Sequence, residues 1–270
     1  MPRAHRHYVP GYIWHLTHRC HNREFLLKYS PDRSHWLDWL AKAVHRYHLS
    51  VLNYMVTCNH VHLLVQDTMN QSIARSMQLA AGRTAQDFNE RRKRKGAFWE
   101  DRYHATAVQS GHHLRRCMLY IDLNMVRAGA VTHPADWLHC GFHELHSNRA
   151  GTRILDCDRL CALMGASNRE QLKAISEAML VNQEFAAEHQ RQAFWSESIA
   201  VGNDEFVKGY STALGNRIGA RQVVDLDESG TLALQEPRAS YSSIQSSHEM
   251  RTMDGDNCVP MDLDFDVLSD

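Results

Sequence analysis

The stretch from residue 51 to residue 66 constrains the fold of this chain more than any other part of it. It holds two strand-like runs, 51–57 (VLNYMVT) and 60–66 (HVHLLVQ), and only Cys58 and Asn59 separate them. Two apolar, β-branched runs joined by two residues are typical of a β-hairpin. We therefore expect a sheet with antiparallel pairing, built around this hairpin.

The elements on either side of the hairpin alternate between strand and helix. Ser30, Pro31 and Asp32 combine an N-cap, a proline at the first helical position and an early acid, which together mark the start of a helix. The order β-α-β-β-α-β-α predicts an α+β fold, a ferredoxin-like (split βαβ) sandwich with an antiparallel sheet, in which the first and third strands are central. Besides the hairpin, the expected elements are strands at 12–18 and 98–108 and helices after Ser30, at about 71–92 and at about 112–127.

Composition divides the 270 residues into three parts. Residues 1–150 contain the expected sandwich, and residues 151–220 carry helical stretches without evident strand pairing, which we expect to form a helical appendage. Residues 221–270 are acidic, rich in serine and poor in aromatic residues, which favours a disordered tail. We place the domain boundaries at these changes in composition.

Charge is distributed unevenly along the chain. Residues 1–130 hold 19 Lys and Arg against 9 Asp and Glu, whereas residues 221–270 hold 3 against 11. A basic first half favours a polyanionic partner, and the acidic tail could oppose it as a mimic of that partner. No run approaches 18 apolar residues and the N-terminus has no apolar segment, so we expect no membrane span, no secretory signal and a cytoplasmic location.

His60 and His62 are the first candidates for chemistry. Side chains alternate along a strand, so these two imidazoles share one face and could chelate one metal ion. The H-x-H pattern alone is weak evidence, because the chain has 19 histidines and a second such pair at His5 and His7. The setting distinguishes His60 and His62, since they lie on the most apolar strand, where an imidazole needs a partner.

Tyr120 and Asn124 are the next candidates. They are four residues apart on the helix expected at 112–127 and therefore share one face of it. Taken alone, each could be an ordinary helix residue. Together with two imidazoles, an amide oxygen would leave open positions on a divalent ion that polarises a phosphodiester oxygen, and the tyrosine could attack that phosphorus as a covalent nucleophile.

Four strings carry a resemblance to a known family. They are WHLTHRCHNR at 14–23, CNHVHLLV at 58–65, GAFWEDRY at 96–103 and YIDLNMVRAGAV at 120–131. Over about residues 8–146 the chain resembles the HUH (His-hydrophobic-His) single-tyrosine transposases of the IS200-like group, above all the REP-associated tyrosine transposases. Two positions depart from the family pattern, Cys58 and Met125, where family members commonly have proline.

The resemblance implies cleavage and rejoining of hairpin-forming, REP-like single-stranded DNA through a 5′-phosphotyrosine, with Mg²⁺ or Mn²⁺ as the cofactor. Tyr120 would be the nucleophile, and His60, His62 and Asn124 the metal ligands. Relatives use glutamine or histidine as the third ligand, where this chain has Asn124. Such an enzyme would be associated with the nucleoid. Relatives differ in being monomers or dimers, so a homodimer is possible here.

Cations near these strings are candidates for binding DNA, because they can follow phosphates while aromatic rings stack on unpaired bases. Phe98 and Trp99 are as much core candidates as stacking candidates. Two alternatives to the transposase remain open: a module that binds structured single-stranded DNA without cutting it, and a metal hydrolase with water as the nucleophile. The candidate DNA-binding residues are Arg19, Arg23, Arg91, Arg92, Lys93, Arg94, Lys95 and Arg102.

Overall fold

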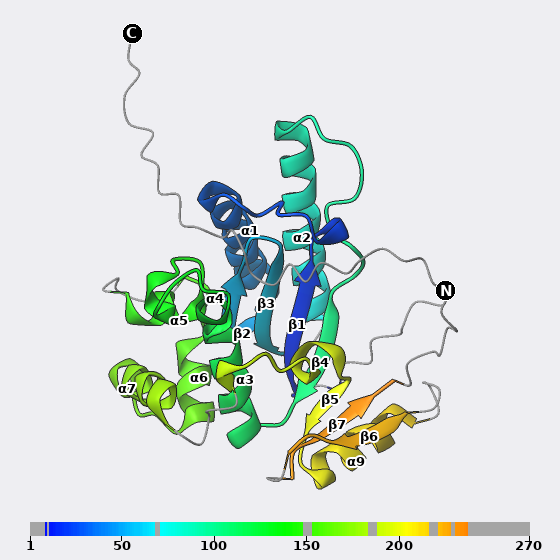
Figure 1. Ribbon diagram of the computed structural model, residues 1–270, viewed down its shortest axis with the longest axis vertical. Helices are drawn as coiled ribbons and strands as arrows, with labels where there is room; N and C mark the ends of the chain where they lie inside the picture. The colour runs from blue at the N-terminus through cyan, green and yellow to red at the C-terminus, as the bar shows by residue number, and fades with distance from the viewer. Residues whose placement is uncertain are drawn as a thin grey trace.

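The computed structural model describes residues 9, 11–67, 71–147, 153–182, 188–215, 221–227 and 230–236. Over these residues the chain forms one seven-stranded sheet, in the order β2-β3-β1-β4-β5-β7-β6, with helices on both of its faces (Figure 1). No helix in this part of the chain is both long and apolar enough to cross a membrane.

The first four strands and the first two helices form the expected split βαβ unit. β1 lies between β3 and β4 and pairs with both in antiparallel fashion, and β2 pairs with the other edge of β3. The α+β class and the central position of the first and third strands are therefore confirmed. The elements are β1 (Ile13–Arg19), α1 (Ser30–Tyr47), β2 (Ser50–Val56), β3 (His60–Gln66), α2 (Ser72–Arg91) and β4 (His104–Val108).

Local signals explain most of these boundaries. Pro31 stands in the first turn of α1 with Asp32, and His48 ends the helix in the left-handed conformation. In the β2–β3 turn, the Thr57 hydroxyl donates to the carbonyl of His60, 2.9 Å away. The fourth strand is shorter than expected, because only His104–Val108 is continuous and Trp99 makes an isolated bridge to Cys20.

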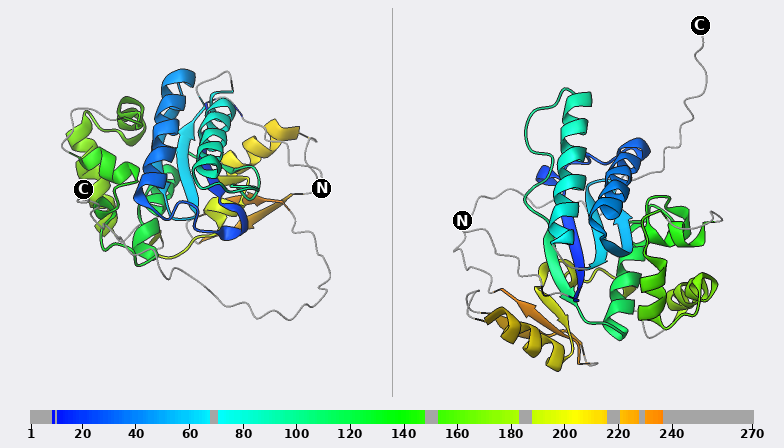
Figure 2. Two further views of the ribbon diagram at one scale, coloured as in Figure 1. Left: turned by 90° about the horizontal axis from the view of Figure 1, so that it is seen from above. Right: turned by 180° about the vertical axis from the view of Figure 1, so that it is seen from behind.

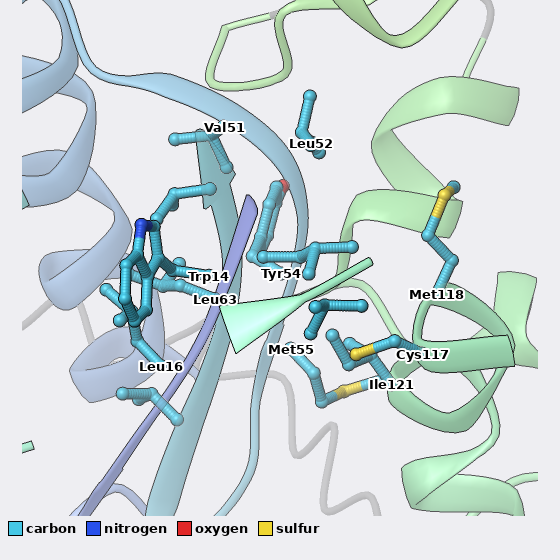
Figure 3. Close-up of a cluster of buried hydrophobic side chains, with 14 of the residues drawn as sticks. Trp14, Leu16, Val51, Leu52, Tyr54, Met55, Leu63, Cys117, Met118 and Ile121 are labelled. Atoms are coloured by element: carbon cyan, nitrogen blue, oxygen red, sulfur yellow. The ribbon is translucent and has the colours of Figure 1, made fainter. Parts of the chain in front are cut away.

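The sheet separates two apolar layers (Figure 3). Trp14, Leu16 and Leu63 lie on the side of α1, while Met55 faces the opposite side, toward α3 (His112–Asp122). The helix expected at 112–127 is interrupted at Leu123 and continues as α4 (Asn124–Arg127). Helix α3 packs against β2, where the Asn53 side chain donates to the carbonyl of Met118 at 3.3 Å.

Three further helices flank α3 (Figure 2), and the last two of them lie within residues 151–220, where a helical appendage is expected. Isolated bridges join Met55 to Cys140 and Val51 to Leu155, so the connections between these helices extend the edge of the sheet at β2. These helices are α5 (Gly141–His146), α6 (Cys157–Met164) and α7 (Arg169–Val181).

The end of the described chain is less helical than the sequence pattern indicates. Three strands continue the sheet beyond β4, with β5 parallel to β4, so the expectation of no strand pairing here was wrong. Two of them, β6 and β7, fall in the stretch expected to be disordered, whereas residues 237–270 lie outside the described residues. The domain boundaries at 150 and 220 stay predictions. The elements are α8 (Phe194–Glu197), β5 (Ala200–Gly202), α9 (Asp204–Leu214), β6 (Gln222–Asp225) and β7 (Leu232–Gln235).

Candidate active site

His60 and His62 project from β3 on the face of the sheet that α3 covers. Their ring centroids are 4.8 Å apart, and the His62 side chain is only 3% exposed. A third imidazole, that of His15 on β1, stacks on His62 with its centroid 5.1 Å away. The alternation of side chains along the strand therefore correctly predicts that His60 and His62 share one face. The cluster, however, contains a third imidazole, that of His15.

The hydrogen bonds of His60 leave one ring nitrogen available. Its Nδ1 lies 2.7 Å from the amide oxygen of Asn59 and 2.9 Å from the hydroxyl of Thr57. An amide oxygen only accepts, so the proton of a neutral ring lies on Nδ1 and Nε2 keeps its lone pair. Burial, with smaller contributions from Arg19 and other cations, lowers the pKa of His60 to about 3, so the ring is neutral near pH 7.

Asn124 brings its amide to the same cluster. Its Nδ2 donates to Nε2 of His62 at 3.2 Å. Burial, reinforced by His60 and His15, holds the pKa of His62 well below its usual value, so this ring is also neutral. The chain thus offers two neutral imidazoles and an amide that can turn its oxygen inward, a donor set that fits a divalent ion. Within the described residues, no three His, Cys, Asp or Glu side chains form a group that could hold a metal ion, so the candidate donor set here includes an asparagine.

Tyr120 lies on α3 directly over the imidazoles. Its ring centroid is 6.2 Å from that of His62, and the guanidinium of Arg127 lies 4.3 Å from the ring centroid of Tyr120. Burial raises the pKa of Tyr120, and the charge of Arg127 opposes that rise. The structure therefore brings together the four residues that the sequence singles out, although their roles stay predictions.

The segment 188–198 covers this cluster and was missed by the sequence reasoning, which treats it only as part of the appendage. Trp195 is fully buried, with its ring centroid 6.4 Å from that of Tyr120, and its carbonyl lies 2.8 Å from Nδ1 of His15. Arg127 donates to the carbonyl of Glu188 at 2.8 Å. Under this cover Tyr120 is only 4% exposed. The adjacent Phe194 and Trp195 are the one sequence signal that could have indicated a packed segment here.

Glu188 fastens the covering segment to the sandwich. Its carboxylate accepts from Nε1 of Trp195 at 2.9 Å and from Nε of Arg116 at 2.8 Å, and both charged side chains are buried. Arg116 also pairs with Asp227 at 2.6 Å, in the connection between β6 and β7. The C-terminal strands and the cover are therefore held by the same arginine of α3.

Three of the five residues in the basic run pair with acids. Arg91 and Arg92 both approach the carboxylate of Asp32, and Arg94 lies 3.5 Å from that of Glu24. Lys93 and Lys95 are exposed, and neither has an ion pair within the described part of the chain. The bare positive charge of the run is therefore concentrated on these two lysines.

The other candidate cations divide into two groups. Arg19 is exposed at the end of β1 and is paired with His60 in the register of β1 and β3. Arg23 lies in the loop that follows, where its carbonyl accepts a hydrogen bond from the side chain of Asn59 at 3.2 Å. These two lie at the same end of the sheet as the imidazoles. Arg102 is exposed in the irregular stretch before β4.

Phe98 and Trp99 pack inward rather than offering a stacking surface. Phe98 is buried against Phe88, and Trp99 stacks on His18 with a centroid distance of 4.1 Å. The exposed aromatic rings in the described residues are instead Phe25 (54% exposed) and Tyr29 (53% exposed). The sequence reasoning missed both, although two aromatic residues between Arg23 and the start of α1 are an available signal.

The split βαβ sheet carries a His-hydrophobic-His pair on a central strand, faced by a tyrosine on the helix packed against it, as the sequence resemblance to HUH single-tyrosine transposases implies. Residues 8–124 match the family model described as "Transposase IS200 like". The similarity to the IS200-like transposases thus spans 117 of the 270 residues. No curated protein matches the chain.

The solved structures that resemble the chain include two transposase-related proteins. A REP-associated tyrosine transposase bound to a REP hairpin aligns over 58% of this chain and 94% of its own, with a TM-score of 0.44 and 20% identity. A transposase-like protein from Deinococcus radiodurans R1 aligns over 42% of this chain and 89% of its own, with a TM-score of 0.32 and 19% identity.

Proposed function

We propose that the chain is a metal-dependent endonuclease and strand transferase for hairpin-forming single-stranded DNA, acting through a 5′-phosphotyrosine. One observation carries the proposal: Tyr120 lies over two neutral imidazoles and the Asn124 amide on one face of the sheet. The similarity of residues 8–124 to the IS200-like transposases supports the reaction class, DNA transposition. Dimer formation and association with the nucleoid stay predictions.

The reaction exchanges one phosphodiester for another. The Tyr120 oxygen forms a bond to phosphorus and loses its proton, while the bond from phosphorus to the 3′ oxygen breaks and that oxygen gains a proton. A divalent ion held by His60, His62 and Asn124 would polarise the non-bridging oxygens of that phosphate. Since the aryl ester conserves the phosphodiester bond, a 3′-OH can reverse the step and rejoin the strand.

The chain offers a path for the DNA away from the site. Arg19 lies opposite His60, and the loop after it leads through Arg23 to the exposed rings of Phe25 and Tyr29. The guanidinium of Arg92 lies 5.6 Å from the Tyr29 ring centroid, so the basic end of α2 borders these rings. Cations beside exposed aromatic rings suit a single strand, with phosphates on the charges and bases on the rings.

One observation favours the alternative of a DNA-binding module that does not cut. Tyr120 is 4% exposed beneath residues 188–198, and a nucleophile in that state cannot touch a phosphate. If this cover never opened, the chain would bind DNA and leave it intact. Covalent capture distinguishes the two functions.

The test is a suicide-substrate assay with labelled hairpin single-stranded DNA and Mn²⁺, followed by a denaturing gel. We expect a covalent protein–DNA adduct from the full chain, its loss in Tyr120→Phe and a large reduction in His60→Ala. Tyr47→Phe is the matched control, since Tyr47 lies on α1, on the other side of the sheet. An adduct that persists in Tyr120→Phe would overturn the assigned nucleophile. Turnover without any adduct would indicate a hydrolase that uses water.

A further inference from the structure

His15 takes no part in the reaction as described, yet it lies at the centre of the imidazole cluster. It is fully buried in the middle of β1. Its Nδ1 is 2.8 Å from the carbonyl oxygen of Trp195, and its Nε2 is 2.9 Å from Nδ1 of His62. On the far side of the His62 ring, Nε2 meets the amide of Asn124. The contacts form one chain from the covering segment to the candidate metal ligands.

The direction of the hydrogen bonds along this chain follows from its first member. A backbone carbonyl only accepts, so Nδ1 of His15 carries a proton. A second proton on Nε2 would place an unpaired charge in a fully buried position with no carboxylate bonded to the ring, which is costly. Nε2 of His15 is therefore an acceptor, and Nδ1 of His62 is the donor to it.

The other end of the chain fits this assignment. With its nitrogen toward His62, the Asn124 amide donates to Nε2, 3.2 Å away, which then carries the lone pair. The contact with His15 thus favours the His62 tautomer with its proton on Nδ1, and the contact with Asn124 is compatible with it. That lone pair lies on the side of the ring that faces Asn124.

We propose that His15 is a positioning residue, which is anchored by the Trp195 carbonyl and holds His62 in the tautomer whose Nε2 can bind a divalent ion. The proposal rests on the proposed function only in taking His62 as a metal ligand. A ligating histidine is commonly oriented by a hydrogen bond from its other ring nitrogen, and the loss of such a partner costs about 10- to 100-fold in metal affinity. The partner is unusual here because it is a second imidazole, and because its own anchor belongs to the segment that covers the nucleophile.

The first test reads the tautomer directly in protein that has no metal bound. Long-range ¹H–¹⁵N correlation spectra of the full chain with ¹⁵N-labelled histidine show which nitrogen of His62 carries the proton. We expect the proton on Nδ1 in the wild-type chain and in His15→Gln, whose amide oxygen can still accept it, and a mixture of tautomers in His15→Leu. A wild-type His62 with its proton on Nε2 would overturn the proposal.

The second test measures Mn²⁺ affinity without DNA, by the loss of the free-ion signal in electron paramagnetic resonance. We expect His15→Leu to weaken binding by about 10- to 100-fold and His15→Gln to restore most of it. His18→Gln is the matched control, because His18 is a buried histidine on the same strand and its ring bonds to the carbonyl of Asp101. Unfolding temperatures of all variants separate lost positioning from lost folding.

The outcomes distinguish this proposal from the proposed function. If His60→Ala leaves Mn²⁺ affinity unchanged, the metal site itself is wrong. If His60→Ala abolishes binding while folded His15→Leu binds as the wild type does, the metal site stands and the positioning role of His15 is refuted.

Discussion

Buried histidines determine how the stability of this protein responds to acid, and His139 is the clearest case. Its side chain is buried and bonds to the Ser30 hydroxyl at 3.0 Å, and burial, with help from Arg33 and His143, lowers its pKa to about 4. The unfolded chain binds a proton at this residue below about pH 6.5, whereas the folded chain does so only near pH 4. The contribution is therefore fully present above pH 6.5 and is lost as the pH falls toward 4.

We expect His139→Gln to flatten this dependence, because glutamine can bond to Ser30 and does not titrate. Between pH 6.5 and pH 4, the wild-type chain should lose up to about 3 kcal/mol more free energy of unfolding than the variant does. This upper limit is 1.36 kcal/mol for each unit by which the His139 pKa is lowered. Urea unfolding at pH 7, 6, 5 and 4 measures this difference, and His45→Gln, at an exposed residue of α1, is the control. Parallel curves for His139→Gln and the wild type would contradict the assignment.

At the residue scale, periodicity predicts partners within an element but not between elements. The alternation of β3 and the helical spacing of four bring His60, His62, Tyr120 and Asn124 into consideration. His15 stands in an equally ordinary run, and its contact with His62 depends on the register of β1 against β3, in which Thr17 lies opposite His62. The residue pattern of either strand alone does not predict how β1 and β3 are aligned.

Helix α5 packs so closely against β2 that no side chain fits at Gly141. A Cβ at Gly141 would lie 2.3 Å from Oδ1 of Asn53 and 3.1 Å from the backbone nitrogen of Tyr54. We expect Gly141→Ala to lower the free energy of unfolding by about 1–3 kcal/mol, because the edge of the sheet must shift. Gly82→Ala is the control, since a Cβ there meets nothing within 4 Å and should add about 0.5–1 kcal/mol to helix α2. Thermal unfolding of both variants tests this prediction. Equal shifts in the unfolding temperatures of Gly141→Ala and Gly82→Ala would contradict the close packing of α5 on β2.

At the element scale, the sequence predicts the split βαβ unit well because each of its elements is long and bounded by turn signals. The C-terminal strands were missed for the opposite reason. β5 has three residues, all buried, and it is defined by pairing with β4 rather than by alternation. Aromatic contacts of Tyr12 with Phe206 and Tyr210, at 5.4 and 5.6 Å, fasten α9 beside it, and such contacts between distant segments leave no local signature.

The described part of the chain is closed over the proposed nucleophile, Tyr120. The contact of His15 with Trp195 spans 180 residues, and the ion pair of Arg116 with Glu188 spans 72. The described C-terminal strands and the segment 188–198 are thus folded onto the split βαβ unit, where composition alone suggests only an appendage. If Tyr120 is the nucleophile, as we propose, DNA must reach it, so residues 188–198 have to move before the strand is cut. The energy that holds them would then be part of the barrier to cleavage.

Glu188→Gln tests that barrier. The substitution keeps an acceptor for the Trp195 indole but removes the charge that faces Arg116 in a buried pair. Asp227 still pairs with Arg116, so we expect opening to become easier by about 1–3 kcal/mol rather than the larger cost of an isolated buried charge. If opening limits the rate, single-turnover adduct formation at saturating Mn²⁺ should accelerate by about 5- to 160-fold, and acrylamide should quench Trp195 fluorescence more strongly. Glu170→Gln, in an exposed pair with Lys173 on α7, is the control.

Unchanged quenching would mean that the Glu188 carboxylate does not hold the covering segment in place. Stronger quenching at an unchanged rate of adduct formation would mean that a step after opening limits cleavage.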